Sequence, residues 1–295
     1  MIEITQNIES KLTFSGHDSF QCRQLWLKKG FDFLVEGKNF NDDNAVISLG
    51  VGKNMVSSIR FWLKAFNIID HKDQITEFGN RLFNDVTGYD PYLEDEASLW
   101  LLHYQLVKTN VSSIYNVIVN EFRKEKIHFN KESFIHYMRR IAESNPELNF
   151  NENTLGKDFV VFSNIYKNDT ESKDIEESYS GILSELEFLT VIGSGKDEQF
   201  TILNNEKDSL PSAVVLYAIS DNPNYGMSIS LNALELDFNS PGAIFALNRK
   251  GLLNKISEIT SEKDNVTFTD HAGIKELQFK SKPSPYTILD HYYGR

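Results

Sequence analysis

The chain has 295 residues, of which 42 are acidic and 30 are basic, so its formal net charge is −12 at pH 7. This balance argues against a long basic scaffold for nucleic acid, and a 40% hydrophobic, 12% aromatic content excludes disorder for most of the chain. The length favours about two domains of roughly 100–200 residues each. The single cysteine, Cys22, excludes an intramolecular disulfide framework and a cysteine-rich zinc site.

We expect a cytoplasmic protein, because a single cysteine fits a reducing compartment. Residues 1–12 include Glu3 and Glu9 and lack the apolar run of a signal peptide. No stretch approaches about 18 consecutive apolar residues, so the sequence predicts no membrane-spanning helix and no membrane partner.

Residues 1–95 predict a first domain built around a helix-turn-helix. Apolar residues at helical spacing predict a first helix over Phe20–Leu34 and a short second helix over Asp42–Leu49. The sequence Gly50-Val51-Gly52 breaks the second helix, and an apolar stripe from Met55 to Phe66 predicts a longer third helix. Helices joined by a tight glycine turn are typical of a helix-turn-helix.

A hairpin is predicted after the third helix. Ile68-Ile69 and Ile75 predict two short strands around the polar tip His71–Gln74, and Thr76 opens another helical run to Phe83. Because a hairpin that follows a helix-turn-helix is typical of a winged helix, this is the architecture expected for the N-terminal domain.

The same order of helices followed by a hairpin recurs in the rest of the chain. Residues 96–167 predict a helical connector, residues 168–220 a second winged-helix-like segment with an acidic loop at 168–178, and residues 221–295 a third. The expected elements are helices at Glu96–Phe122, Asn130–Ala142, Asn151–Tyr166, Tyr179–Leu189, Ser228–Leu236, Pro241–Leu247, Asn248–Ile259 and Tyr286–Tyr293, and hairpin strands at Thr190–Ile192, Phe200–Ile202, Val266–Asp270 and Ile274–Phe279. The predicted fold class is mainly α with short β-hairpins (α+β), with tandem winged helix-turn-helix modules joined by a helical connector.

The glycine turn invites comparison with a phosphate-binding loop, because glycines before a lysine at a helix start can present backbone N–H groups to an anion. The match fails. A Walker loop needs a glycine five residues before the Gly-Lys pair and Ser or Thr after it, and these positions hold Ile47 and Asn54. We therefore interpret the segment as a turn between two helices and expect no cofactor.

The polar residues of the third helix form the candidate DNA-binding face. Lysine and arginine neutralise phosphates, asparagine pairs with adenine, and serine reaches phosphate oxygens. Residues 20–64 hold 7 basic and 4 acidic groups, a small positive excess on an acidic chain. Because a winged helix serves equally well as a protein-interaction module, DNA contact and protein docking both stay open. The candidate DNA-binding residues are Lys53, Asn54, Ser57, Ser58, Arg60, Lys64 and, on the wing, Lys72.

His17 stands beside Asp18, which raises the hypothesis of a catalytic base and its orienting carboxylate. Adjacent residues seldom hydrogen-bond in that geometry, and no surrounding motif marks a nucleophile. We therefore expect no catalytic residue here, but a loop in which Asp18 or Ser19 caps the first helix. Cys22, on the apolar face of that helix, is expected in the core.

Metal binding is not expected either. The seven histidines include no His-x-x-x-His or His-x-His pair. The carboxylates of Asp90–Glu96 could hold Mg²⁺, but their order also fits a turn followed by an acidic first helical turn, which the helix dipole favours. The same cluster could instead pair with Arg60 and remove it from DNA contact. These carboxylates also raise a functional hypothesis, that of a nuclease or nucleotide hydrolase. It would use Asp90, Glu94, Asp95 and His103.

Several segments together carry a family resemblance. They are Phe14–Phe20 with Arg23, Trp26–Gly30, Leu49–Val56, Ile59–Trp62, Asp90–Asp95 and Leu99–His103, and later Ser209–Pro211, Ser240–Phe245 and His271–Gly273. These segments resemble a bacterial family known as domain of unknown function 4007. The resemblance covers nearly the whole chain, and the string Leu-Gly-Val-Gly-Lys-Asn-Met-Val is a fairly specific part of it.

The resemblance implies a biological context more than a chemistry. Members of the family are similar to proteins encoded beside phosphoadenosine-phosphosulfate-reductase-like enzymes in DNA phosphorothioation and related phage-defence clusters, and some are fused to such enzymes. No motif of the reductase-like domain is found here, so we expect any sulfur chemistry to belong to a partner. The resemblance and the residues together predict a non-enzymatic DNA-binding or adaptor subunit. Its expected partners are double-stranded DNA and a sulfur-transfer or other defence-system protein.

The alternative is a protein-only docking module for a phosphoadenosine-phosphosulfate-reductase-like or ATPase partner, with no DNA contact. Pairing of Lys53, Arg60 and Lys64 with carboxylates, or their burial, would favour this alternative, because the helix would then lose its free cations.

Overall fold

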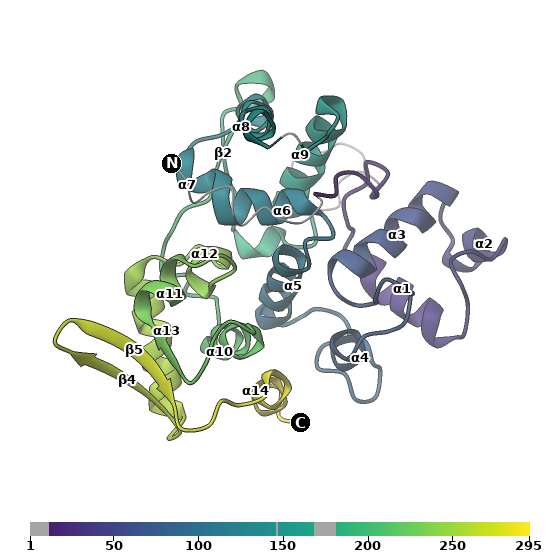
Figure 1. The fold of residues 1–295 in the computed structure, drawn as a ribbon. Coiled ribbons are helices and arrows are strands. Elements are labelled where there is room, and N and C mark those ends of the chain that lie inside the picture. The colour runs from purple at the N-terminus through teal and green to yellow at the C-terminus, as the bar shows by residue number, and fades with distance from the viewer. Residues whose placement is uncertain (1–11, 146, 168–180) are drawn as a thin grey trace. The chain divides into compact units, whose positions relative to one another are not determined.

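The computed structural model of the chain describes residues 12–145, 147–167 and 181–295 (Figure 1). By its internal contacts the chain divides into two units, unit 1 (residues 1–202) and unit 2 (residues 203–295). The predicted division into four segments is finer than this one and remains a prediction. The predicted acidic loop at 168–178 lies outside the described residues.

The first helices of unit 1 follow the predicted order. They are α1 (Trp26–Val35), α2 (Ala45–Leu49), α3 (Lys53–Ala65) and α4 (Glu77–Phe83). Helix α1 has no side-chain cap, so the predicted capping by Asp18 or Ser19 is wrong. Both of these residues have positive φ angles, 48° and 65°, in a turn that ends well before the helix begins.

The turn between α2 and α3 is tight, as predicted. Gly50 ends α2 in the left-handed conformation with a φ of 61°, and the N–H groups of Gly50 and Val51 donate to the carbonyls of Ile47 and Val46. A residue with a Cβ would be strained there by roughly 1–2 kcal/mol. Glycine therefore lets the chain leave α2 and enter α3 within a few residues.

The hairpin after α3 is shorter than predicted. Ile69 and Ile75 form one isolated antiparallel bridge in place of two strands. The carboxylate of Asp70 accepts the backbone N–H groups of Lys72 and Gln74 at 2.7 and 2.9 Å. Because a side chain satisfies these N–H groups, the tip does not depend on strand pairing.

The predicted connector is deeply buried. Helix α5 (Glu96–Thr109) is buried on all sides from Ala97 to Val107, and Asn110, with a φ of 55°, ends it. The predicted helix Glu96–Phe122 is therefore interrupted, and the chain continues as α6 (Ser113–Val117), the π-helix η1 (Ile118–Phe122) and α7 (Arg123–Glu125).

Helices α8 (Lys131–Ser144) and α9 (Glu152–Tyr166) match their predictions, and each begins at an asparagine that caps it. The predicted helix Tyr179–Leu189 is wrong within the described residues, which contain only the 3₁₀ turn η2 (Ser184–Leu186). Gly181 and Leu183 there donate to carbonyls at the end of α9, so this segment completes α9 instead of forming a helix. A predicted hairpin follows, with β1 (Thr190–Ile192), η3 (Gly195–Asp197) and β2 (Gln199–Thr201).

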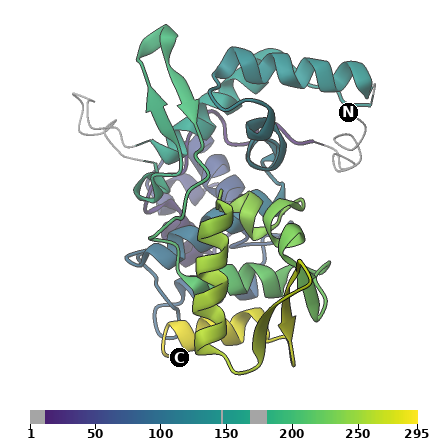
Figure 2. The same ribbon diagram turned by 90° about the vertical axis from the view of Figure 1, so that its left-hand side faces the viewer.

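Unit 2 places a three-stranded antiparallel sheet beside its helices. The strand order is β3-β5-β4, and β4 lies against α13, as the yellow hairpin and yellow-green helix of Figure 2 show. The C-terminal helix, predicted over Tyr286–Tyr293, packs on α10. In the described part of the chain, every helix is too short or too polar to cross a bilayer. The elements are α10 (Ser212–Asp221), β3 (Ser228–Ser230), α11 (Leu231–Leu236), α12 (Pro241–Ile244), α13 (Arg249–Glu262), β4 (Val266–His271), β5 (Ile274–Phe279) and α14 (Pro285–Tyr292).

A buried polar contact ties the N-terminal segment of unit 1 to α9 and α3. Asp158 of α9 is 1% exposed; one of its oxygens accepts the N–H of Ser15 at 2.8 Å, and the other lies 3.2 Å from Nε2 of His17. Nδ1 of His17 accepts the N–H of Ser19, so the ring proton is on Nε2, next to the carboxylate. The imidazole also stacks on Trp62 of α3, with 5.8 Å between ring centroids.

Replacing Asp158 with alanine should destabilise unit 1 by about 3 kcal/mol, because the N–H of Ser15 loses its acceptor and the buried ring of His17 loses the carboxylate beside it. All three tryptophans lie in unit 1, at Trp26, Trp62 and Trp100, so tryptophan fluorescence during urea unfolding reports this unit. The exposed neighbour variant Asp18→Asn is the control and should unfold like the wild type. Equal midpoints for all three proteins would contradict a stabilising role for the contact.

Candidate nucleic-acid interface

The polar side of α3 carries the predicted DNA-binding residues, and the structure separates them into groups. Lys53, Asn54 and Ser57, in the first half of the helix, are exposed. Ser58 is 0% exposed because it lies on the same side as the buried Ile59, so its hydroxyl is not part of the exposed face. This residue was predicted to contact DNA from its polarity alone, and its helical position places it in the core.

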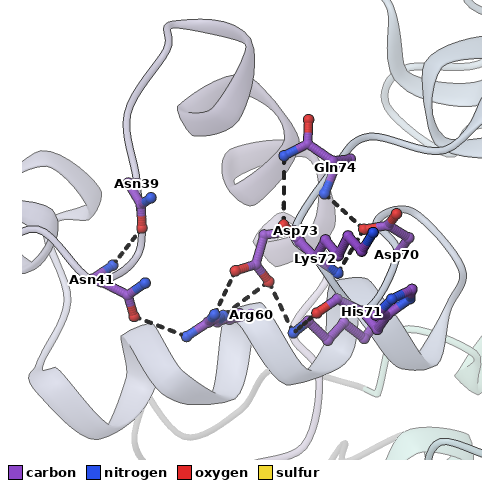
Figure 3. A network of polar contacts seen from close by, with 9 residues as sticks. Asn39, Asn41, Arg60, Asp70, His71, Lys72, Asp73 and Gln74 are labelled. Atoms are coloured by element: carbon purple, nitrogen blue, oxygen red, sulfur yellow. Dashed lines mark hydrogen bonds and ion pairs between the residues drawn. The ribbon is translucent and has the colours of Figure 1, made fainter.

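In the second half of α3, Arg60 is held by a carboxylate from the following loop. Its Nε donates to Asp73 at 2.9 Å, a second guanidinium nitrogen donates to the other oxygen of the same carboxylate, and Nη1 donates to Asn41 at 3.1 Å (Figure 3). All three nitrogens of the guanidinium are therefore engaged within the protein.

The same carboxylate also holds the second cation of this half. Nζ of Lys64 lies 2.9 Å from Asp73 and donates to the carbonyl of His71 at 3.3 Å. Arg60 and Lys64 are one helical turn apart, where like charges repel by a few tenths of a kcal/mol. Asp73 offsets this repulsion, and the three charged groups keep one net positive charge.

The pairing changes the proton affinities of both partners. Hydrogen bonding to Asp73 raises the pKa of Arg60. Burial alone would raise the pKa of Asp73, but hydrogen bonds from Arg60 and Lys64 and their positive charges outweigh it and hold that pKa below its ordinary value. Asp73 is therefore ionised at neutral pH, with its side chain 17% exposed between two half-buried cations.

The backbone conformation of the loop after α3 directs the side chain of Asp73 toward this helix. Asp73 has a φ of 63°, and its N–H donates to the carbonyl of Asp70. Figure 3 shows its carboxylate directed back toward Arg60, while Lys72 lies at the exposed tip. Within the described residues, no hydrogen bond or ion pair holds the side chain of Lys53 or Lys72, so both cations remain available at the ends of the predicted face, although the charge of Lys72 acts on the nearby carboxylate of Asp70.

The acidic residues 90–96 have the capping role that their order indicates. The carboxylate of Asp90 accepts the N–H groups of Glu94 and Asp95, each at 2.9 Å, and the carboxylate of Asp95 accepts that of Ala97 at the start of α5. The carboxylate partner of Arg60 is thus Asp73, not this cluster. In the described residues no three His, Cys, Asp or Glu side chains converge to hold a metal ion.

The histidines of the sequence hypotheses are core residues. His103 is 0% exposed, and its Nδ1 lies 2.8 Å from the hydroxyl of Tyr166. His17 contacts Asp158, far away in the sequence, instead of the adjacent Asp18. Cys22 is buried as predicted, and its burial raises the pKa of the thiol well above the ordinary value, so it is not a reactive thiolate.

The described chain is thus a mainly helical protein with small antiparallel sheets, and α3, which follows the tight turn at Gly50, presents a partly neutralised cationic side. A family model described as "Protein of unknown function (DUF4007)" matches residues 14–293, and the chain belongs to this family, as the resemblance predicted.

Solved structures extend the comparison to the fold. A crystal structure of SspB is similar with a TM-score of 0.81 and 25% identity, over 96% of this chain and 88% of that one. A structure described as magnesium ion-bound SspB is similar over the same shares, with a TM-score of 0.82 and 24% identity. Among curated proteins, no match was found.

Replacing Arg60 with glutamine should raise the pKa of Asp73, because the carboxylate loses its strongest donor. The wild-type carboxylate stabilises the fold above its unfolded pKa of about 3.9 and loses this contribution as the pH falls through its lower folded value. Carbon-13 NMR of the Asp73 carboxyl measures its pKa in the wild type and in Arg60→Gln. The control Lys53→Gln removes a cation of the same helix and should leave the pKa of Asp73 unchanged. An unchanged pKa of Asp73 in Arg60→Gln would show that its pairing with Arg60 does not control this carboxylate.

Proposed function

We propose that the chain is a non-enzymatic DNA-binding or adaptor subunit of a bacterial DNA-modification or phage-defence system of the phosphorothioation type. The observation that carries this proposal is the exposed first half of α3, the helix that follows the tight turn at Gly50. Membership of the family supports the context that the resemblance implies, which is that of proteins encoded in such gene clusters. The likeness to SspB over nearly the whole fold agrees with it.

The proposed architecture is a tandem of winged helices. In unit 1, α1, α2 and α3 precede a short hairpin closed by the bridge between Ile69 and Ile75. In unit 2, α13 precedes the β4–β5 hairpin, and β3 completes the sheet. In both units a helix on the surface is followed by a hairpin, which is the order that a winged helix requires. The hairpin β1–β2 after α8 and α9 is the counterpart in the second predicted segment.

In the proposed DNA complex, the N-terminal half of α3 enters the major groove. Lys53 contacts a phosphate or a guanine, Asn54 pairs with adenine, and Ser57 reaches a phosphate oxygen. Lys72, at the exposed loop tip, contacts the neighbouring backbone. The proposed partner on the protein side is a sulfur-transfer or other defence-system protein.

The pairing of several cations with carboxylates of the same chain supports the docking alternative. Arg60 and Lys64 share Asp73, and on α13 the side chain of Arg249 pairs with Glu235 and that of Lys250 with Glu206. Apolar side chains are also exposed beside the helix-turn-helix, with Ile47 of α2 at 78% and Leu25, just before α1, at 60%. Neutralised cations and exposed apolar groups suit a protein partner better than a DNA backbone.

A second candidate function is the nuclease or nucleotide hydrolase of the sequence hypotheses, in which Asp90, Glu94, Asp95 and His103 act with a divalent metal; one similar solved structure is described as magnesium ion-bound SspB. The carboxylates of Asp90 and Asp95 are occupied by backbone N–H groups and His103 is buried, so the residues named for this function do not form an open ligand set. Incubation with supercoiled plasmid and Mg²⁺ separates the candidates. The non-enzymatic proposal expects no nicked product, and nicking that EDTA abolishes would establish the second candidate instead.

DNA contact predicts binding that weakens steeply with salt. For wild-type protein and a duplex, log Kobs should fall linearly with log salt, and the double variant Lys53→Gln/Lys72→Gln should reduce the slope by about 2, or about 0.9 for each lost phosphate contact. Fluorescence anisotropy of a labelled duplex, recorded at roughly 20–200 mM salt, measures this slope.

The matched control is Lys126→Gln, which removes an exposed lysine beyond α7 and should not change the slope. An undetectable interaction at low ionic strength, for the wild type and also for the Asp73→Asn variant described below, would reject DNA contact. A protein partner that co-purifies from the host and stays bound after nuclease treatment would then identify the docking module.

A further inference from the structure

We propose that Asp73 is a built-in competitor of the DNA backbone, which holds Arg60 and Lys64 away from DNA until a phosphate group replaces it. This inference rests on the proposed DNA contact of α3 and adds a means of regulation to it. The loop after α3 is then an autoinhibitory element as well as a wing.

The geometry of the Arg60 contact supports this role. Two adjacent nitrogens of the guanidinium donate to the two oxygens of one carboxylate, which is the forked arrangement that arginine also forms with phosphate. Lys64 approaches the same carboxylate at 2.9 Å, as lysine approaches a phosphate as a point charge. Asp73 therefore occupies the position that a backbone phosphate would take between the two cations.

The contact is accessible to a competing anion. The side chains of Arg60 and Lys64 are 32% and 25% exposed, so a phosphate can approach them from solvent. Asp73 belongs to the five-residue tip 70–74, whose neighbours His71, Lys72 and Gln74 are exposed. Release of the carboxylate thus requires a side-chain rotation or a small movement of the tip, while the buried Ile68 and Ile69 remain in the core.

The charges determine the direction of the effect. With Asp73 in place, the two cations have one net positive charge, and Asn41 occupies the remaining nitrogen of Arg60. When a DNA phosphate takes the place of Asp73, the displaced carboxylate stays nearby and repels the backbone. Removing its charge should therefore strengthen DNA binding, whereas a carboxylate that only orients Arg60 for DNA would have the opposite effect on its removal.

Asp73→Asn is the variant that tests this inference. Asparagine has the same shape and tolerates the left-handed conformation that Asp73 adopts, so the turn is preserved. Glu77→Gln is the matched control, because it also removes one negative charge. Glu77 begins α4, and its carboxylate pairs with Arg81 of the same helix instead of a residue of α3. A wild-type far-UV circular dichroism spectrum and a single cooperative thermal transition verify the fold of both variants, since Asp73→Asn loses the stabilisation that its ion pairs provide.

We expect Asp73→Asn to bind a duplex about 5- to 10-fold more tightly than wild type at low salt, with a salt slope steeper by about 1–2 as Arg60 and Lys64 each gain a phosphate. Glu77→Gln should bind like wild type. The gain should disappear in Asp73→Asn/Arg60→Gln/Lys64→Gln, which identifies these cations as its source.

The outcomes separate this inference from the proposed function. If wild type binds DNA and Asp73→Asn binds equally or more weakly, the competitor role is rejected and DNA contact stands. If Asp73→Asn binds and wild type does not, the autoinhibition is complete. If neither binds at low salt, DNA contact is rejected, and the competitor role falls with it.

Discussion

The contact of Asp158 with His17 and Ser15 is the constraint on which the arrangement of unit 1 depends. It joins residues 143 positions apart, and it lies where the N-terminal segment, α3 and α9 meet. A buried carboxylate requires donors, and a strained turn with positive φ angles at Ser15, Gly16, Asp18 and Ser19 supplies them. A Cβ on Gly16 would lie 2.7 Å from the ring of Phe61, so the turn packs directly on α3. Because His17 stacks on Trp62, this contact also determines which side of α3 faces the core.

With one side of α3 held in the core, its other side is left for charged residues. The first half of this exposed side keeps its free polar groups, while Asp73 neutralises much of the second half. The helix is thus neither a strongly basic DNA-binding surface nor an uncharged docking face. In the proposed DNA complex, the affinity of α3 depends on one carboxylate in a short loop, because the rest of the chain has an acidic balance.

Local patterns predicted most of the helices, because apolar spacing and caps act over a few residues. The glycine turn at Gly50, the helices over Asn130–Ala142 and Asn151–Tyr166 and the β4–β5 hairpin were all predicted in this way. The failures share a tertiary cause. The segment after Gly181 resembled a helix but pairs with the end of α9, and the predicted start of α1 at Phe20 is displaced because the preceding turn folds onto Asp158.

Residue types and their spacing along the chain predicted the helical class, the family, the tight turn before α3 and the set of polar residues on α3. Packing in space decides which of those residues are available. Ser58 is buried by its helical phase within the packed unit, and Arg60 and Lys64 are held by a carboxylate 13 residues after Arg60, at the tip of a loop. Coulomb attraction depends on distance in space, and residue type and order alone do not specify how a loop returns to its helix.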